Sequence, residues 1–187
     1  TGGALAIGAA YDFDNGFTAA FGAQFDNNGV TGIGTDETED SYALNAAYTG
    51  DNYGVSVTYA NVEVVDVNDT YTALNGYYSF SNGLNISAGY EIGDLDAEPA
   101  VEDEAEAFFV GINGEVGPGE LGAALGTYGK MTETAALGIP DRMMYEIYYS
   151  YAVNDGMTIT PLIYTKEAAD TNDTDETGIM VKTSFSF

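Results

Sequence analysis

The chain has 187 residues, with 30 acidic and 4 basic side chains and no histidine or cysteine, so its formal net charge is −26. Phosphate binding needs basic side chains, which excludes nucleic acid as a partner. Without cysteine or histidine, disulfides, thiolate or imidazole metal sites and histidine-based catalysis are excluded. We therefore expect no enzyme activity, no catalytic residues, no metal site and no cofactor, with small cations as electrostatic partners.

The composition favours strands and turns over helices. Hydrophobic residues make up 45% of the chain, including 15 Tyr and 9 Phe, and there are 24 Gly but only 4 Pro. No apolar run approaches the roughly 18 residues of a membrane-spanning helix. Aromatic and β-branched residues suit strands, and glycine suits the turns between them. The expected class is all-β.

Apolar and polar residues alternate with a period of two in segments along the whole chain, most clearly over 17–25, 53–59, 84–90 and 145–153. This period places one face of each strand in an apolar phase and the other in water. Many segments approach the roughly 9–11 residues of a tilted membrane-crossing strand. We expect eleven strands, near 4–13, 17–26, 42–49, 53–61, 71–80, 84–92, 105–115, 121–130, 143–153, 157–166 and 178–187.

The links between these segments alternate in length. Short links rich in Asn, Asp and Gly lie at 14–16, 49–52, 81–83, 116–119 and 154–156. Long links, which carry most of the acidic residues, lie near 27–41, 62–70, 93–104, 131–142 and 167–177. Bacterial outer-membrane barrels have short periplasmic turns and long external loops. The pattern therefore predicts an antiparallel transmembrane β-barrel in the outer membrane of a Gram-negative cell.

The last segment, 178–187, places Ile179, Val181, Phe185 and Phe187 on one face. Counting links back from its periplasmic end, the first segment starts on the outer side. Bacterial barrels have an even number of strands and begin and end in the periplasm. We therefore expect residues 1–187 to form the carboxyl-terminal part of a larger barrel; the alternative is an uncounted strand in 93–104 or 131–142.

Polar residues on the opposite face of the strands are candidates for a pore wall. Such side chains set ion selectivity through their local potential, although they could also be only the wet face of a barrel. The expected pore-lining residues are Asn45, Asn75, Asn85, Glu91, Asn113, Glu115, Lys130, Glu146, Lys166 and Lys182. The three lysines could form a positive patch opposite Glu146, or structural ion pairs with neighbouring strands.

Residues 143–161 carry the pattern E-x-Y-Y-x-Y-x-V-x-D-x-x-x-I-T-P, from Glu146 to Pro161, and the chain ends Ser-Phe-Ser-Phe. This hairpin and tail resemble those of cyanobacterial outer-membrane porins of the carbohydrate-porin (OprB-like) group, often described as iron-uptake porins. The resemblance is specific over 143–187 and weak elsewhere. Members also carry an amino-terminal S-layer-homology segment, which is not recognised in these residues.

The resemblance implies a barrel of about sixteen strands that lets small ions and nutrients diffuse passively, frequently as a homotrimer. It also makes Phe185 and Phe187 a candidate signal for the barrel assembly machinery. Outer-membrane lipid and lipopolysaccharide would be the surrounding partners. The iron label rests on resemblance alone, because the sequence offers no soft or imidazole ligand.

The sequence thus predicts an outer-membrane porin for small hydrophilic solutes and inorganic ions, with acidic loops that concentrate cations at the mouth. One alternative is a secreted acidic β-sandwich, a binding or adhesion protein with calcium-stabilised loops, which would bury the apolar faces against a second sheet. Another is an outer-membrane enzyme that uses carboxylates such as Glu91 or Glu146.

Overall fold

The structure is a computed structural model of the 187-residue chain. It describes residues 4–26, 39–64, 67–96, 104–128, 142–168 and 174–186. Two residues predicted to be functional, Lys130 and Phe187, lie outside these ranges. Within them, no helix is long and apolar enough to cross a membrane.

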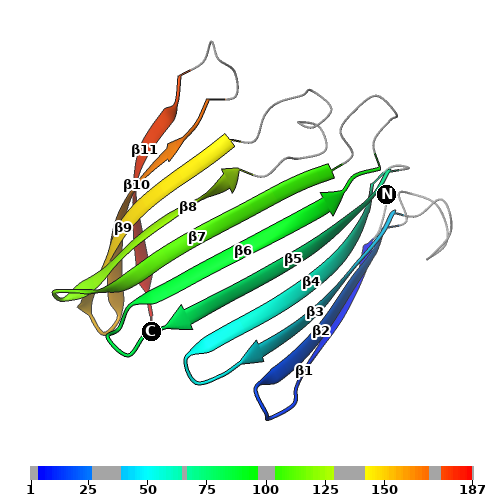
Figure 1. The fold of residues 1–187 in the computed structure, drawn as a ribbon, viewed down its shortest axis with the longest axis horizontal. Coiled ribbons are helices and arrows are strands. Elements are labelled where there is room, and N and C mark those ends of the chain that lie inside the picture. The colour runs from blue at the N-terminus through cyan, green and yellow to red at the C-terminus, as the bar shows by residue number, and fades with distance from the viewer. Residues whose placement is uncertain are drawn as a thin grey trace.

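The described residues form eleven strands and the turns between them, which confirms the all-β class (Figure 1). Their bounds are β1 Ala4–Asp12, β2 Phe17–Asp26, β3 Glu39–Thr49, β4 Tyr53–Val64, β5 Val67–Ser79, β6 Asn85–Asp94, β7 Glu104–Val116, β8 Gly119–Tyr128, β9 Arg142–Asn154, β10 Met157–Lys166 and β11 Glu176–Phe185. Most of the region 131–142 and residues 97–103, where an uncounted strand was the alternative, lie outside the described ranges.

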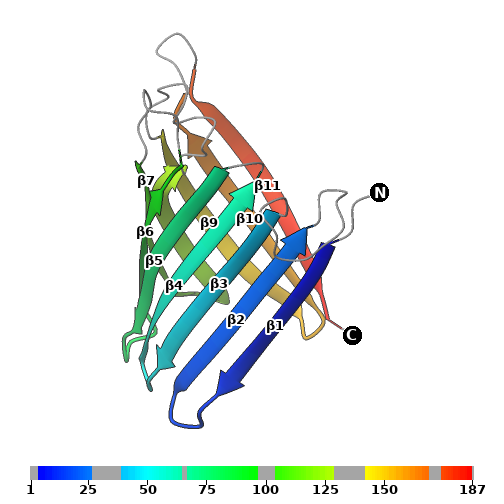
Figure 2. The same cartoon turned by 90° about the vertical axis from the view of Figure 1, so that its right-hand side faces the viewer.

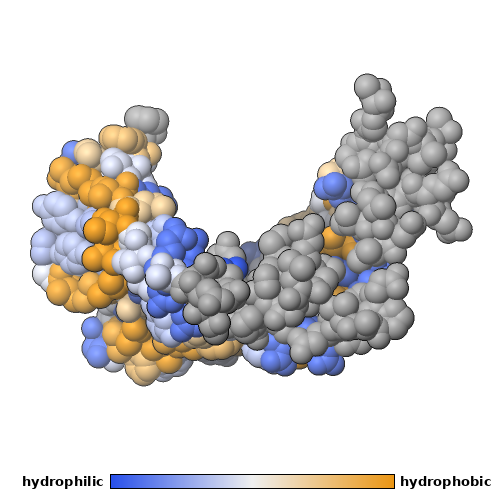
Figure 3. All heavy atoms as spheres, turned by 90° about the horizontal axis from the view of Figure 1, so that it is seen from above, coloured by the Kyte–Doolittle hydropathy of each residue, from blue (hydrophilic) through white to orange (hydrophobic). Residues whose placement is uncertain are grey.

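All eleven strands belong to one antiparallel sheet, and their order in the sheet is their order in the chain. Figures 1 and 2 show that the strands are inclined in the same sense and that the sheet is strongly curved. Seen from the end that carries the long links, the molecule is a U-shaped trough (Figure 3). Among the described strands, β1 and β11 are the two edges of the sheet.

The short links are tight turns in which the backbone must reverse within a few residues. Gly16, Gly83 and Gly117 adopt positive φ angles of 88°, 83° and 62°. Glycine has no Cβ to clash in this region, so these turns suit it. Asp14 also has a positive φ, 59°, and its amide nitrogen donates to Asp12 Oδ1 at 3.0 Å.

The link expected at 62–70 is not a long loop. β4 continues to Val64 and β5 begins at Val67, with Val64 paired to Val67, so only residues 65 and 66 separate the strands. Cross-strand contacts sustain the ladder: Asn61 Nδ2 donates to Asn68 Oδ1. β-Branched valines favour this extension. The acidic residues here had suggested a loop, so the strict alternation of short and long links was wrong at this position.

The register keeps each face uniform across strand boundaries. On the apolar face, one row of paired residues runs through Tyr11, Ala19, Ala46, Val57, Leu74, Tyr90 and Phe108. On the polar face, a row crosses all eleven strands through Asp12, Thr18, Ala47, Ser56, Asn75, Gly89, Phe109, Gly126, Met144, Lys166 and Glu176. A shift by one residue at any pair would exchange the two faces.

The apolar face has no protein layer over it among the described residues. Leu74 and Ile179 are 61% and 77% exposed, whereas the buried hydrophobic residues of the described chain are Ala23, Leu95 and Ala105. A water-soluble sheet buries its large apolar side chains. The second sheet that the alternative β-sandwich would require is not present in the described part of the chain, whose strands all belong to one sheet.

Aromatic side chains gather on the apolar face near the short turns, where Tyr11 meets Phe13 and Tyr78 meets Phe80, each pair with ring centroids 4.8 Å apart. This matches an aromatic girdle. Tyr71, by contrast, points to the other face and packs against Leu95 and Ala105.

Gly126→Ala tests the close contact between β7 and β8. An added Cβ would lie 2.5 Å from the carbonyl oxygen of Phe108 and 3.0 Å from Phe109 Cβ, so the two strands would have to separate. We expect the free energy of unfolding to fall by about 1–3 kcal/mol, measured by urea titration in detergent micelles. Gly22→Ala is the control, because nothing lies within 4 Å of its added Cβ. Equal losses in both variants would contradict this packing.

Candidate functional site

The polar face of the sheet is the candidate functional site. The register places nine of the ten predicted pore-lining residues on it; they are Asn45, Asn75, Asn85, Glu91, Asn113, Glu115, Glu146, Lys166 and Lys182. The tenth, Lys130, lies outside the described residues. The alternating strands bring these side chains, which are scattered over 138 positions of sequence, onto one continuous surface.

This face lies on the inside of the trough. Along β4, the polar-face residues Ser56 and Thr58 are half-buried, while the neighbouring Val55 and Val57 are exposed. In Figure 3, hydrophobic residues gather on the outer contour of the U and hydrophilic residues face its hollow. Curvature crowds the inner side chains, which explains why the smaller polar residues are less exposed than the large apolar ones outside.

Hydrogen bonds between strands order part of the polar wall. Asn45 Nδ2 donates to Thr58 Oγ1 at 2.8 Å and to the carbonyl oxygen of Val57 at 3.3 Å. Thr160 Oγ1 donates to Ser150 Oγ at 3.1 Å. These bonds hold the side chains against the sheet.

Glu120 is the centre of a second cross-strand network. Its carboxylate accepts from Asn113 Nδ2 at 2.8 Å and from the Tyr148 hydroxyl at 3.0 Å, so it ties β7, β8 and β9 together. Glu115 lies directly opposite in the register. Sequence reasoning selected Asn113 and Glu115 but missed Glu120, the second residue of β8, which follows a tight turn.

Sequence reasoning also missed aromatic rings on the polar face. Tyr77, Phe109, Tyr148 and Tyr164 lie over the facing glycines Gly54, Gly89, Gly122 and Gly178, where an added Cβ would overlap the ring. A ring that covers a glycine also restores the packing that the missing side chain loses. The pairs Tyr77-Tyr78, Phe108-Phe109 and Tyr148-Tyr149 were the available signal, because consecutive residues of a strand point to opposite faces.

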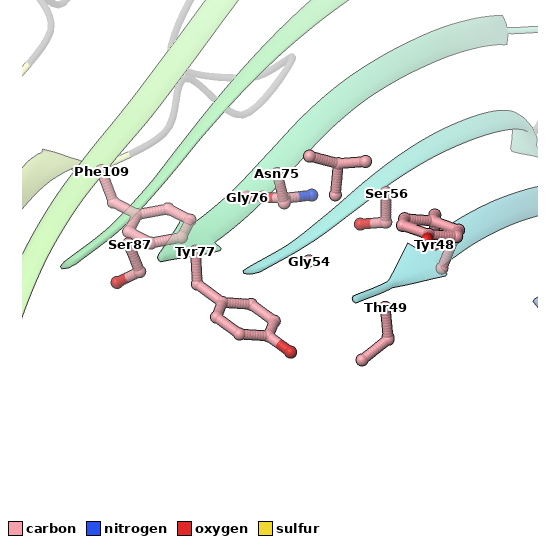
Figure 4. A pocket seen from close by; sticks show the side chains of 11 residues that line it. Tyr48, Thr49, Gly54, Ser56, Asn75, Gly76, Tyr77, Ser87 and Phe109 are labelled. Atoms are coloured by element: carbon pink, nitrogen blue, oxygen red, sulfur yellow. The ribbon is translucent and has the colours of Figure 1, made fainter. Parts of the chain in front are cut away.

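Two shallow depressions adjoin the Phe109 ring. One of about 340 Å³ is lined by Thr49, Ser56, Asn75, Tyr77, Ser87 and Phe109, among others (Figure 4). The other, of about 300 Å³, is lined by Asn75, Glu91, Phe109 and Thr127, among others. Asn75 and Phe109 therefore border both.

Charges are unevenly distributed over the wall. The four basic residues of the chain all follow β8 in the sequence, so β1–β8 contain none. On β10, Lys166 lies opposite Glu176 in the register, and its Nζ is 5.4 Å from the centroid of the Tyr164 ring. Glu146 pairs with Tyr164 and Ala124 rather than with a lysine.

The described residues contain no group of three His, Cys, Asp or Glu side chains arranged to hold a metal ion. Most of the acidic loop near 170–176 lies outside these residues. The expectation that the chain has no metal site and no cofactor stays a prediction.

A curved antiparallel sheet with an exposed apolar exterior and a polar hollow is characteristic of outer-membrane channel proteins, because lipid requires every backbone polar group to be paired within the sheet. Residues 65–186 match the Gram-negative porin family, and the chain belongs to that family. The family and the fold imply an outer-membrane channel rather than an enzyme. A comparison with curated proteins finds no match.

Solved porins share the fold. An anion-selective porin from Comamonas acidovorans is 16% identical, with a TM-score of 0.74 over 97% of this chain and 59% of that one. Salmonella typhi OmpF, in complex with daunomycin, is 16% identical, with a TM-score of 0.58 over 90% and 61%. The KdgM porin, in complex with disordered oligogalacturonate, is 12% identical, with a TM-score of 0.50 over 98% and 92%. This chain thus spans about three-fifths of the length of the first two.

Glu120→Ala tests the three-strand network. It leaves the Asn113 and Tyr148 donors without their carboxylate, so we expect a loss of about 1–3 kcal/mol in the free energy of unfolding, measured by urea titration in micelles. Glu115→Ala is the matched control; it removes a like charge facing Glu120, so stability should stay or rise slightly. A larger loss for Glu115→Ala would contradict this assignment.

A pair of arginine substitutions on β5 tests which face meets lipid. Leu74→Arg places a charge on the apolar face, so folding into lipid vesicles should weaken by roughly 2–4 kcal/mol. Ala73→Arg points the charge to the polar face, opposite Glu91, and should be tolerated. Vesicle folding titrations measure both, and the reverse order would overturn the assignment of faces.

Proposed function

We propose that the polar face lines a water-filled pore through which small hydrophilic solutes and inorganic ions diffuse passively down their gradients. The observation that carries this proposal is the inversion of the sheet: its large apolar side chains are exposed on the convex side, while Asn, Ser, Thr and Glu side chains face the hollow. Size exclusion and the potential of the wall then select solutes, and no bond is made or broken. The nine described residues predicted from the sequence, together with Lys130, are the proposed pore-lining set.

We further propose that the eleven strands are the carboxyl-terminal part of a larger barrel of about sixteen strands. Two features support this: the sheet has two unpaired edges, β1 and β11, among the described strands, and the chain matches 59% of the Comamonas porin. Closure would remove both edges, as barrels do.

The proposed pore favours cations. The formal net charge is −26, and the part of the polar face formed by β1–β8 carries Asp12, Glu91, Glu115 and Glu120 without a basic residue. A wall of one sign raises the local concentration of counter-ions. The anion-selective porin from Comamonas is only 16% identical to this chain, so the similarity concerns the fold and does not extend to ion selectivity.

The finer proposals rest on the sequence resemblance. We propose that the protein is a cyanobacterial carbohydrate porin or iron-uptake porin and that it forms a homotrimer in a lipopolysaccharide-containing membrane. We also propose that the barrel assembly machinery recognises Phe185 and Phe187. The exposure of Phe185 supports its recognition by the assembly machinery. Its side chain is 62% exposed on the apolar face, at the end of β11 that lies beside the short turn between β9 and β10.

Planar-bilayer recording of the purified protein tests the pore and its selectivity. We expect a stable conductance and a reversal potential across a KCl gradient that indicates cation preference. Glu91→Gln should lower the ratio of K⁺ to Cl⁻ permeability, more strongly at 0.1 M salt than at 1 M, where the screening length falls from about 10 to 3 Å.

Glu106→Gln is the control for this measurement. Glu106 is on the apolar face, where it accepts a 2.8 Å hydrogen bond from the Tyr90 hydroxyl, so the permeability ratio should not change. Absence of conductance would overturn the pore, and a wild-type preference for anions would overturn the proposed cation selectivity.

A further inference from the structure

Tyr77 and Phe109 are large aromatic residues on the polar face, yet they are 44% and 42% exposed. Side chains of this size normally gain stability from burial. In this sheet their exposed surface faces the hollow of the trough, and the Phe109 ring borders two depressions. Figure 4 shows the rings near Ser87, with Ser56 and Thr49 farther along the same depression.

Gly89 permits this arrangement. A Cβ at position 89 would overlap both the Phe109 ring and Asn75 Oδ1, so the ring and the amide converge over the same stretch of backbone. Gly54 does the same beneath the Tyr77 ring. One face of each ring is therefore set against the sheet, which leaves the other available to a solute.

Charge determines which solute suits these rings. An aromatic face attracts a cation within about 6 Å of its centroid. The same wall already contains one such pair, Lys166 Nζ at 5.4 Å from the Tyr164 centroid. The described strands around Tyr77 and Phe109 supply no cation of their own, because β1–β8 contain no Lys or Arg. Glu91, which lines the second depression with Phe109, adds a negative charge.

We propose that the wall of the pore around Phe109 binds small organic cations, such as quaternary or alkylated ammonium ions, in the two adjoining depressions that Phe109 and Asn75 border, one with Tyr77 and the other with Glu91. The proposal rests on the proposed pore and adds a solute class to it. In the first depression the Tyr77 and Phe109 rings contact the alkylated ammonium group, and the Ser56 and Ser87 hydroxyls bind its polar substituents. In the second depression the Glu91 carboxylate neutralises its charge beside Phe109 and the Asn75 amide.

Choline is the probe, and its neutral carbon isostere 3,3-dimethylbutan-1-ol is the matched ligand control. Both are added during planar-bilayer recording of the full protein, and the concentration that halves the K⁺ current is measured. We expect choline to reduce the current at lower concentration than the neutral isostere, because only choline has a cationic centre for the rings and Glu91.

Replacing one ring by an apolar side chain isolates its contribution. Tyr77→Leu and Phe109→Leu should each weaken block by choline roughly two- to five-fold, the range for one cation–π contact at an exposed site, whereas Tyr77→Phe should retain it. Tyr78→Leu is the control, since Tyr78 is the neighbouring residue on the apolar face, where it packs against Phe80.

The outcomes distinguish the proposed organic-cation site from the proposed pore. Conductance with equal block by choline in the wild type, Tyr77→Leu and Phe109→Leu overturns the binding site and leaves the pore intact. Equal block by choline and its neutral isostere assigns the rings to apolar solutes and likewise overturns the organic-cation site. No conductance from correctly folded protein overturns both.

Discussion

The register of the β-ladder is the constraint on which the rest of the structure depends. Each strand places alternate residues on opposite faces, so ten consecutive pairings must all be in phase to keep an apolar exterior. The row from Asp12 to Glu176 shows that they are, across all eleven strands. Lipid cannot hydrogen-bond to the backbone, so this same pairing also satisfies the polar groups of the membrane-crossing strands.

Because the outer face must carry apolar side chains to contact lipid, polar and charged side chains are mostly confined to the inner face of the sheet. There, glycines create room on the backbone, and rings such as Phe109 and Tyr148 occupy it. Hydrogen bonds through Glu120 hold three strands in place, while Glu91 remains exposed to the hollow. Stability and the proposed selection of solutes thus depend on the same surface, and the Gly126 contact between strands limits how far that surface can be altered.

Sequence reasoning predicted the strands and the face of the nine described polar residues because a period of two is a local property that survives in any correct register. It failed where local chemistry competed with pairing. Residues 62–70 looked like an acidic loop, but valines and the Asn61–Asn68 bond extend the hairpin.

The sequence by itself determined the class of the protein, since alternation, turn chemistry and the absence of histidine and cysteine are readable residue by residue. Only the tertiary structure decided which inner residues meet. Asn75 and Phe109 are 34 positions apart, and they converge over Gly89 because two successive strand pairings fix their relative height. Such convergence depends on the register and curvature of the assembled sheet, which no single strand contains.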